Sequence, residues 1–94
     1  MPRMRQKYIG EIIKLFELEL HCVSQLARAE KMKMRRKIVN VVMSAFMAQN
    51  QTVKVFMGQV EENIADVLDT FVDPWGFRKK LARRVDQKLK QSAE

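Results

Sequence analysis

The residues of this chain that could hold a metal lie within one short segment. The single histidine, His21, follows Glu17 at a spacing of four residues and precedes the single cysteine, Cys22. On a helix, Glu17 and His21 share a face, whereas Cys22 points about 100° away from His21. A structural zinc site needs about four ligands, so this segment could hold a metal only between two copies of the chain. We therefore predict an exposed His21, a packed Cys22, and no metal or cofactor.

Motifs for catalysis are missing from the sequence. There is no glycine-rich phosphate loop, no CxxC pair, and no HExxH or GxSxG pattern. Only Glu17 stands at a helical spacing from His21 that could support acid–base catalysis. We therefore predict no catalytic residue and no enzymatic activity.

Basic charge is the stronger chemical signal. The net charge is +7 and the isoelectric point is about 9.9. Basic and acidic residues balance from residue 59 onward, so the surplus lies in residues 1–58. The residues there that we predict to bind nucleic-acid phosphates are Arg3, Arg5, Lys7, Arg28, Lys31, Lys33, Arg35, Arg36 and Lys37. Such contacts have little sequence preference and weaken strongly with salt. The alternative is a solvated turn and terminus that only keep the protein soluble.

The C-terminal segment carries a basic run that we expect to be partly neutralised within the chain. Arg78, Lys79 and Lys80 are followed by Arg83 and Arg84, whereas the segment 61–73 contains acids and no base. If the two segments pack antiparallel, their opposite charges attract each other.

Apolar periodicity predicts helices along most of the chain. A stripe spaced alternately by four and three residues predicts a helix over residues 7–29. Its members are Ile9, Ile13, Phe16, Leu20, Val23 and Ala27. A second such stripe predicts one long helix over 37–72, with a kink near 50–58 as the alternative. Its members are Val39, Met43, Phe46, Asn50, Val53, Met57, Val60, Ile64, Val67 and Phe71. The stripes are out of phase by two residues, so we place a turn within 28–37; one bent helix is the alternative.

The last segment begins with a predicted turn at residues 73–76. Asp73 and Pro74 suit the cap and the first position of a helix, and Gly76 suits the end of a type I turn. Apolar residues then recur every four positions, which predicts a helix over residues 75–90.

These segments predict a single all-α domain over residues 1–94. Its architecture is antiparallel helical hairpins on one long central helix. Because this layout leaves apolar surface uncovered, we predict that a second copy completes it as a coiled-coil-like helical-bundle homodimer.

Several residues are predicted to contact a partner protein, and they are Val39, Val42, Phe46, Asn50, Phe56 and Trp75. A polar Asn50 in an apolar stripe can fix the register of paired helices, although residues 48–52 could instead form a loop. Tryptophan is common at binding hot spots; alternatively, Trp75 plugs the hairpin before the last helix. The methionines could form an adaptable interface or simply fill the core.

Together these features predict a non-enzymatic, basic helical protein that accompanies nucleic acid as an accessory or regulatory factor. The alternative is an adaptor, inhibitor or assembly subunit that offers an apolar helix face to another protein. Peripheral membrane binding through the basic last helix is less favoured, because its apolar side is narrow and its charges have a nearer acidic partner. A membrane span is not expected, because the longest uncharged apolar stretch, 38–53, is shorter than the about 20 residues that a span needs. A single cysteine gives no sign of an oxidising compartment, so we expect an intracellular, cytoplasmic protein.

Overall fold

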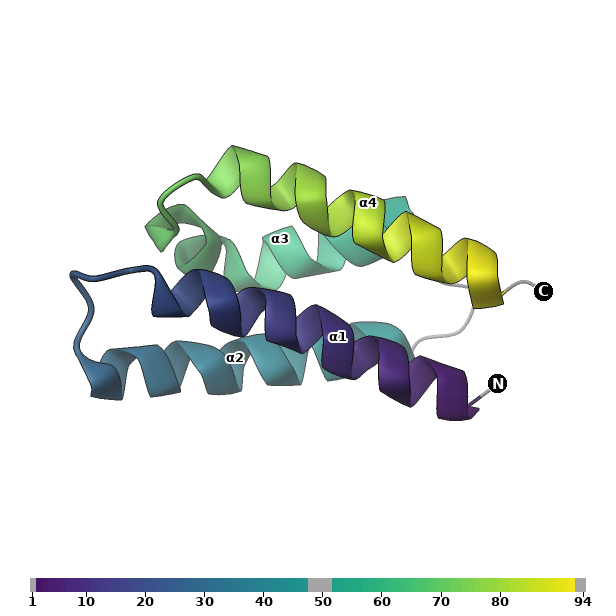
Figure 1. The fold of residues 1–94 in the computed structure, drawn as a ribbon, viewed down its shortest axis with the longest axis horizontal. Helices are drawn as coiled ribbons and strands as arrows, with labels where there is room; N and C mark the ends of the chain where they lie inside the picture. Colours follow the sequence, from purple (N-terminus) through teal and green to yellow (C-terminus); the bar gives the residue numbers. More distant parts are fainter. Residues whose placement is uncertain (1, 48–51, 93–94) are drawn as a thin grey trace.

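The computed structural model describes residues 2–47 and 52–92, and the side chains of residues 7–47 and 52–91. These residues form four helices and no strand: α1 (Pro2–His21), α2 (Arg28–Met47), α3 (Val53–Thr70) and α4 (Pro74–Ser92). The helices run alternately in opposite directions along a bundle of 42 × 22 × 20 Å (Figure 1). Each helix packs against the next, and α1 also packs against α4, which closes a ring. The predicted all-α class is confirmed.

Each helix turns one apolar face toward the centre of the bundle. In α1, the buried residues Ile12, Phe16 and Leu20 recur every four positions, which places them on one side of the helix. The buried residues of the other helices are Ile38, Val42, Ala45 and Phe46 in α2, Phe56, Val60, Ile64, Val67 and Leu68 in α3, and Phe77, Leu81 and Val85 in α4. Burying a side chain of this size contributes roughly 1.5–3 kcal/mol, so this core is the main source of stability.

Aromatic contacts join the helices near both ends of the core. Near the chain termini, the ring of Phe46 in α2 lies 4.5 Å from that of Tyr8 in α1 and 4.8 Å from that of Phe56 in α3. A second group joins α1, α4 and the residue after α3, and consists of Phe16, Phe71 and Phe77. Ring pairs of this kind add about 0.5–1.5 kcal/mol beyond their buried area.

The first turn lies at residues 22–27, so its predicted position within 28–37 is wrong. Helix α2 already begins at Arg28. Val23 is buried in this turn, whereas Ala27 is exposed and does not continue the stripe of α1. The turn contains neither glycine nor proline, the residues that usually mark a chain reversal in a sequence.

The long helix predicted over residues 37–72 is also wrong. Helix α2 ends at Met47, α3 begins at Val53, and the two lie side by side in opposite directions (Figure 1). Thr52 has an extended backbone, with φ of −106° and ψ of 164°. Its hydroxyl accepts a hydrogen bond from the N–H of Val55 at 3.2 Å and so caps the start of α3.

The predicted kink near residues 50–58 does not fall at Gly58, which lies inside α3. The backbone of α3 instead leaves helical geometry at Ile64, where φ is −131° and ψ is 27°. Ile64 is fully buried, so the change of direction takes place in the core, before the chain turns toward α4.

A single chain supplies all four helices of the bundle. The homodimer prediction rests on apolar surface that a long central helix would leave open. Val42 and Phe56, which the sequence predicts to contact a partner, are both buried within one chain. A second copy is not needed to close this core, and the homodimer stays a prediction.

Ion pairs cross every seam between neighbouring helices. In each of them the acid belongs to α1 or α3 and the base to α2 or α4. The pairs are Glu17–Arg35 at 2.8 Å, Asp66–Lys37 at 2.8 Å, Asp69–Arg78 at 3.1 Å and Glu11–Lys88 at 2.9 Å. Exposed pairs contribute only about 0–1 kcal/mol each. Their alternating sign nevertheless disfavours any arrangement that places α2 beside α4.

Asp73 caps α4, as predicted. The N–H of Gly76 donates a hydrogen bond to the Asp73 carboxylate at 3.0 Å, and α4 begins at Pro74. A methyl group on residue 76 would clash with that carboxylate. Glycine at this position therefore makes room for the cap.

We expect Gly58→Ala and Gly76→Ala to differ in their effect on stability. Nothing lies within 4 Å of a methyl group added at Gly58, so alanine there should raise the free energy of unfolding by about 0.5–1 kcal/mol. At Gly76, disturbing the cap costs about 1 kcal/mol, which cancels or exceeds that gain. Urea unfolding followed by circular dichroism measures both variants. Equal stabilisation at the two positions would contradict the role assigned to Asp73.

The pair between Lys37 and Asp66 should make stability depend on pH. The hydrogen bond from Lys37, and then its positive charge, lower the pKa of Asp66. Because the folded state has the lower pKa, the stabilisation is present above the ordinary aspartate pKa of about 3.9 and is lost as the pH falls through the folded value. We expect Asp66→Asn to destabilise the protein at neutral pH and to flatten the loss of stability as the pH falls through and below the ordinary aspartate range. Glu62→Gln, on the same helix, is the control and should keep the wild-type profile.

Candidate anion-binding surface

The predicted phosphate-binding residues form two groups at opposite ends of the bundle. Arg3, Arg5 and Lys7 belong to the start of α1, and the remaining residues belong to the first half of α2 (Figure 1). Lys7 is exposed, and the side chains of Arg3 and Arg5 lie outside the described ones. The fold of one chain therefore does not bring the two groups together.

The α2 group is partly neutralised by neighbouring helices. Arg35 pairs with Glu17 of α1, and Lys37 pairs with Asp66 of α3. Lys31 donates a hydrogen bond to the last carbonyl oxygen of α1 at 3.4 Å. The members of this group that form no ion pair with a described residue are Arg28, Lys33 and Arg36. Successive helical residues differ by about 100°, so these three spread over an arc of about 140° around α2, with Arg28 and Arg36 about 80° apart.

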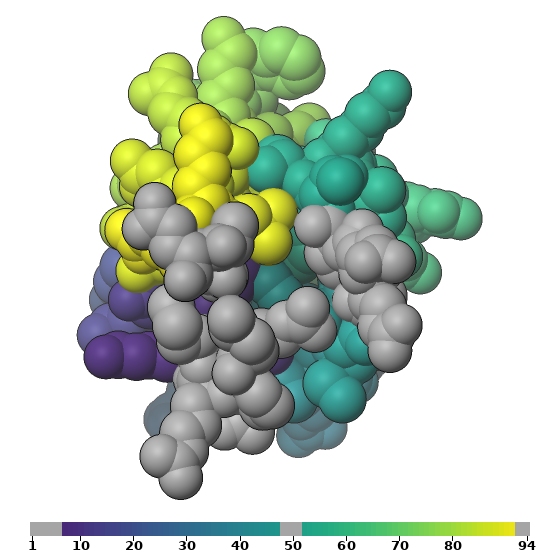
Figure 2. Space-filling model, turned by 90° about the vertical axis from the view of Figure 1, so that its right-hand side faces the viewer, coloured from purple at the N-terminus to yellow at the C-terminus, as the bar shows by residue number. Residues whose placement is uncertain are grey.

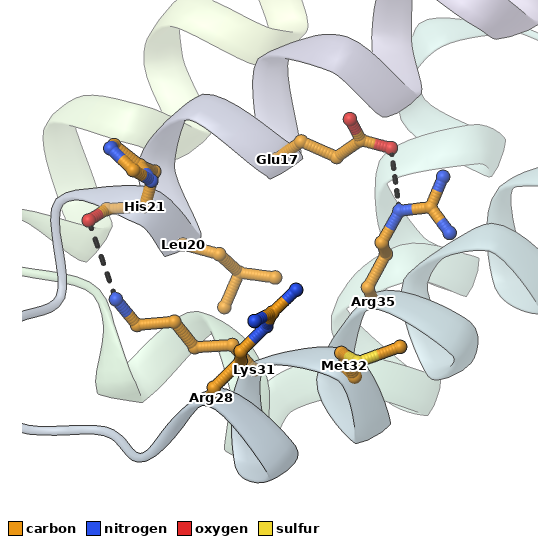
Figure 3. Close-up of a pocket in the computed structure, with 7 residues that line it drawn as sticks. All are labelled: Glu17, Leu20, His21, Arg28, Lys31, Met32 and Arg35. Carbon is orange, nitrogen blue, oxygen red and sulfur yellow. Dashed lines mark hydrogen bonds and ion pairs between the residues drawn. The ribbon is translucent and has the colours of Figure 1, made fainter.

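A shallow cleft of about 180 Å³ lies between the end of α1 and the start of α2 (Figure 3). It is lined by Glu17, Leu20, His21, Arg28, Lys31, Met32 and Arg35. Glu17 turns toward Arg35 on one side of the cleft, and His21 lies on the other side. Glu17 and His21 therefore do not converge, and the described residues contain no cluster of three potential metal ligands.

His21 is exposed, as predicted, but Cys22 is exposed as well. The prediction of a packed Cys22 is therefore wrong. Helix α1 ends at His21, so Cys22 no longer follows the helical face that reaches the core.

A second basic surface lies where α1 packs against α4. At its centre, Glu11 of α1 forms an ion pair with Lys88 of α4 at 2.9 Å. The hydrogen bond from Lys88 lowers the pKa of Glu11, and the positive charges of Lys88, Arg84 and Lys7 lower it further. Arg84 also lines a second cleft, of about 170 Å³, together with Lys14 of α1. Cations from both helices thus surround one carboxylate.

We call this surface the α1/α4 basic face, and its members are Lys7, Lys14, Lys80, Arg84 and Lys88. All of them are exposed except Lys88, which is partly buried. Lys80, Arg84 and Lys88 follow at four-residue intervals, so they share one side of α4 and are about 6 Å apart along its axis. Figure 2 views the bundle from the end at which α1 begins and α4 ends, and shows these two helices side by side, in purple and yellow.

The predicted neutralisation of α4 holds for Arg78 and fails for most of its basic run. Arg78 lies 3.1 Å from Asp69 and 3.8 Å from Glu61, both on α3. Arg84 lines a cleft together with residues of α1, and Lys80 lies one turn before it on the same side of α4. Neither forms an ion pair with a described residue. The sequence signal for that side is the four-residue spacing of its bases, which separates them from Arg78.

Part of the predicted partner-binding surface lies inside the core, which makes that prediction wrong for Val42, Phe46 and Phe56. These side chains are 0%, 5% and 1% exposed. They are covered by the chain's own helices, because α3 folds back onto α2 instead of continuing it. They are therefore not accessible to a partner.

The other predicted partner-binding residues have different environments. Val39 is partly buried on α2. Trp75 is 66% exposed, and the ammonium group of Lys79 lies 5.5 Å from the centre of its ring. Trp75 therefore does not plug a hairpin, and its role as a partner anchor stays a prediction. Asn50 lies outside the described residues, so its role in register also stays a prediction.

Tyr8 lies beneath the α1/α4 basic face. It is 4% exposed, and its hydroxyl has no hydrogen-bond partner among the described residues. Burial raises the pKa of Tyr8, and the negative charges of Glu11 and Asp86 raise it further. Its hydroxyl therefore stays neutral at physiological pH and adds no negative charge to the surface.

None of the described helices has the length and apolar character required to cross a lipid bilayer. In comparisons with known proteins, the chain matches no protein-family model, no curated protein and no solved structure.

Proposed function

We propose that this protein binds an extended polyanion, a nucleic-acid backbone, through the α1/α4 basic face and catalyses no reaction. The observation that supports this proposal is the convergence of cations from two helices around Glu11, whose charge is already paired with Lys88. An isolated bundle gains nothing from such crowding, because like charges repel each other. A ligand that carries many negative charges would relieve the repulsion.

The arrangement of the cations suits a backbone ligand. Lys80, Arg84 and Lys88 form one row along α4, and Lys7 and Lys14 stand about 10 Å apart along α1. Helices α1 and α4 run side by side, so the two rows flank the seam between them. A phosphate backbone that follows the seam could contact both rows.

The same surface supports binding without base recognition. Stacking of bases on single strands requires exposed aromatic side chains. Among the described residues, the aromatic side chain with high exposure is Trp75, which points about 140° away from Lys80 around α4. Contacts would therefore be made with phosphates and would have little sequence preference.

The double variant Lys80→Gln/Arg84→Gln tests the proposal. A plot of log affinity for duplex DNA against log salt concentration has a negative slope. Removing two phosphate contacts should make this slope less steep, by up to about 2. The matched control is Lys33→Gln/Arg36→Gln on α2, which removes equal charge elsewhere. Fluorescence titration of a labelled duplex at several salt concentrations measures both slopes.

Two outcomes of that titration would contradict the proposal. A larger loss of slope in the α2 variant would place the binding surface on the first half of α2, as the sequence predicted. The second outcome is weak binding by the wild-type protein. Dissociation constants above about 10⁻⁴ M at physiological salt, for duplex and single-stranded DNA and RNA alike, would exclude nucleic acid as the ligand of this surface.

Glu11→Gln should strengthen binding. The substitution removes the negative charge at the centre of the α1/α4 basic face and releases the charge of Lys88. We expect the affinity for duplex DNA to rise about two- to fivefold, a modest gain because the charge removed is exposed to solvent. Glu62→Gln, which removes an exposed acid of α3, should change it less. Weaker binding of Glu11→Gln, with unchanged circular dichroism, would contradict the placement of the backbone along this seam.

A further inference from the structure

Helix α2 has a second apolar side that the bundle does not cover. Its first apolar side, which includes Ile38 and Val42, is buried in the core. The second, which we call the methionine row, consists of Met32, Val39, Met43 and Met47. Met32, Met43 and Met47 are 51%, 44% and 74% exposed, and Val39 is partly buried. Because these residues are spaced by seven, four and four positions, they lie within an arc of about 80° around the helix axis. The row is about 22 Å long.

The methionine row continues into the cleft between α1 and α2. Met32 lines that cleft beside Leu20, and Figure 3 shows the two apolar side chains between the charged ones. The cleft therefore offers a recess at one end of a long apolar stripe. Methionine side chains adapt to differently shaped partners, and an anchor in a recess is the usual centre of a binding surface.

The charges along the methionine row are mostly positive. Arg36 lies four residues after Met32 and therefore on the same side of α2, and Arg28 lines the cleft. Glu17 also lines the cleft, but its carboxylate is paired with Arg35. Glu30, the acid of α2, is two residues from Met32 and so points about 200° away. An apolar row with an arginine within it and another at its cleft is complementary to an apolar helix side that carries acidic residues.

We propose that the methionine row and its cleft form a docking site for an acidic amphipathic helix of another protein. The apolar side of that helix lies along Met32, Val39 and Met43, and one large apolar residue enters the cleft beside Leu20. Its flanking aspartate or glutamate residues contact Arg28 and Arg36. This is a helix-in-groove mode of recognition, and it does not depend on the proposed binding of nucleic acid.

A second copy of the chain is a poorer occupant of this site. Two copies that met through the methionine row would bring Arg28 and Arg36 close to the same residues of the other copy. Like charges of this kind disfavour association. A nucleic acid would satisfy the arginines but would leave the methionines facing a polar backbone.

Designed peptides provide the direct test. One peptide of about 18 residues carries leucines at positions i, i+4, i+7 and i+11 with flanking glutamates, and its matched control carries lysines in place of the glutamates. Binding is followed on the full chain by the ¹³C-labelled methyl groups of its methionines. We expect the acidic peptide to shift the signals of Met32, Met43 and Met47, and to leave Met57, which packs against the core, nearly unchanged.

Variants then connect the shifts to the site. The double variant Met32→Gln/Met43→Gln changes only exposed side chains. It should weaken the binding of the acidic peptide at least about tenfold. Val55→Gln is the control, because Val55 is 46% exposed on α3, away from the row. The Val55→Gln variant should bind the acidic peptide with the same affinity as the wild-type protein.

Several results would overturn the proposal. One is the absence of shifts at an acidic-peptide concentration of about 1 mM, and another is equal binding of the basic peptide. Shifts of Met43 and Met47 that depend on protein concentration without peptide would assign the row to a second copy. Shifts of these methyl groups on addition of duplex RNA, with none from the acidic peptide, would assign it to nucleic acid.

Discussion

The packing of α1 against α4 is the contact on which the rest of the structure depends. It converts three consecutive antiparallel contacts into a closed ring, so that Phe16 of α1 can meet Phe77 of α4 in the core. The same contact brings Lys7 and Lys14 beside Arg84 and Lys88, although these residues lie near opposite ends of the chain. Without the contact between α1 and α4, the apolar face of α1 would be covered by α2 but not by α4. The α1/α4 basic face would not form.

Ion pairs connect the same neighbouring helices around the ring. In these pairs a basic residue of α2 or α4 contacts an acidic residue of α1 or α3. Each contact between neighbouring helices contains at least one such pair. Exposed pairs contribute little energy, so their main effect is to favour one order of helices over another. The acids of α1 that pair across its seams, Glu11 and Glu17, do not offset all the bases that face α1. The remaining positive charge is available to a ligand on either side of α1.

Much of the fold could be predicted from apolar spacing and capping residues. The helical class, the buried face of α1 and the Asp73 cap of α4 all follow from local rules. The first turn could not be located, because residues 22–27 contain neither glycine nor proline. The α1/α4 basic face could not be predicted either, because it requires knowing that α4 turns Arg78 toward α3 and Arg84 toward α1. Helix direction alone does not supply that rotation.

The long stripe of residues 39–71 has a physical explanation that differs from a single helix. In α3 it follows the buried residues Val60, Ile64 and Val67, whereas in α2 it reaches the core only at Phe46, and Val39 and Met43 stay outside the buried core. The core of α2 is formed one position earlier, by Ile38 and Val42 and their neighbours. The regular spacing therefore joins the core of α3 to a part of α2 that is buried at Phe46 and outside the core at Val39 and Met43. The exposed methionines on the outside of α2 lie outside the core, which is why we propose that a partner covers them.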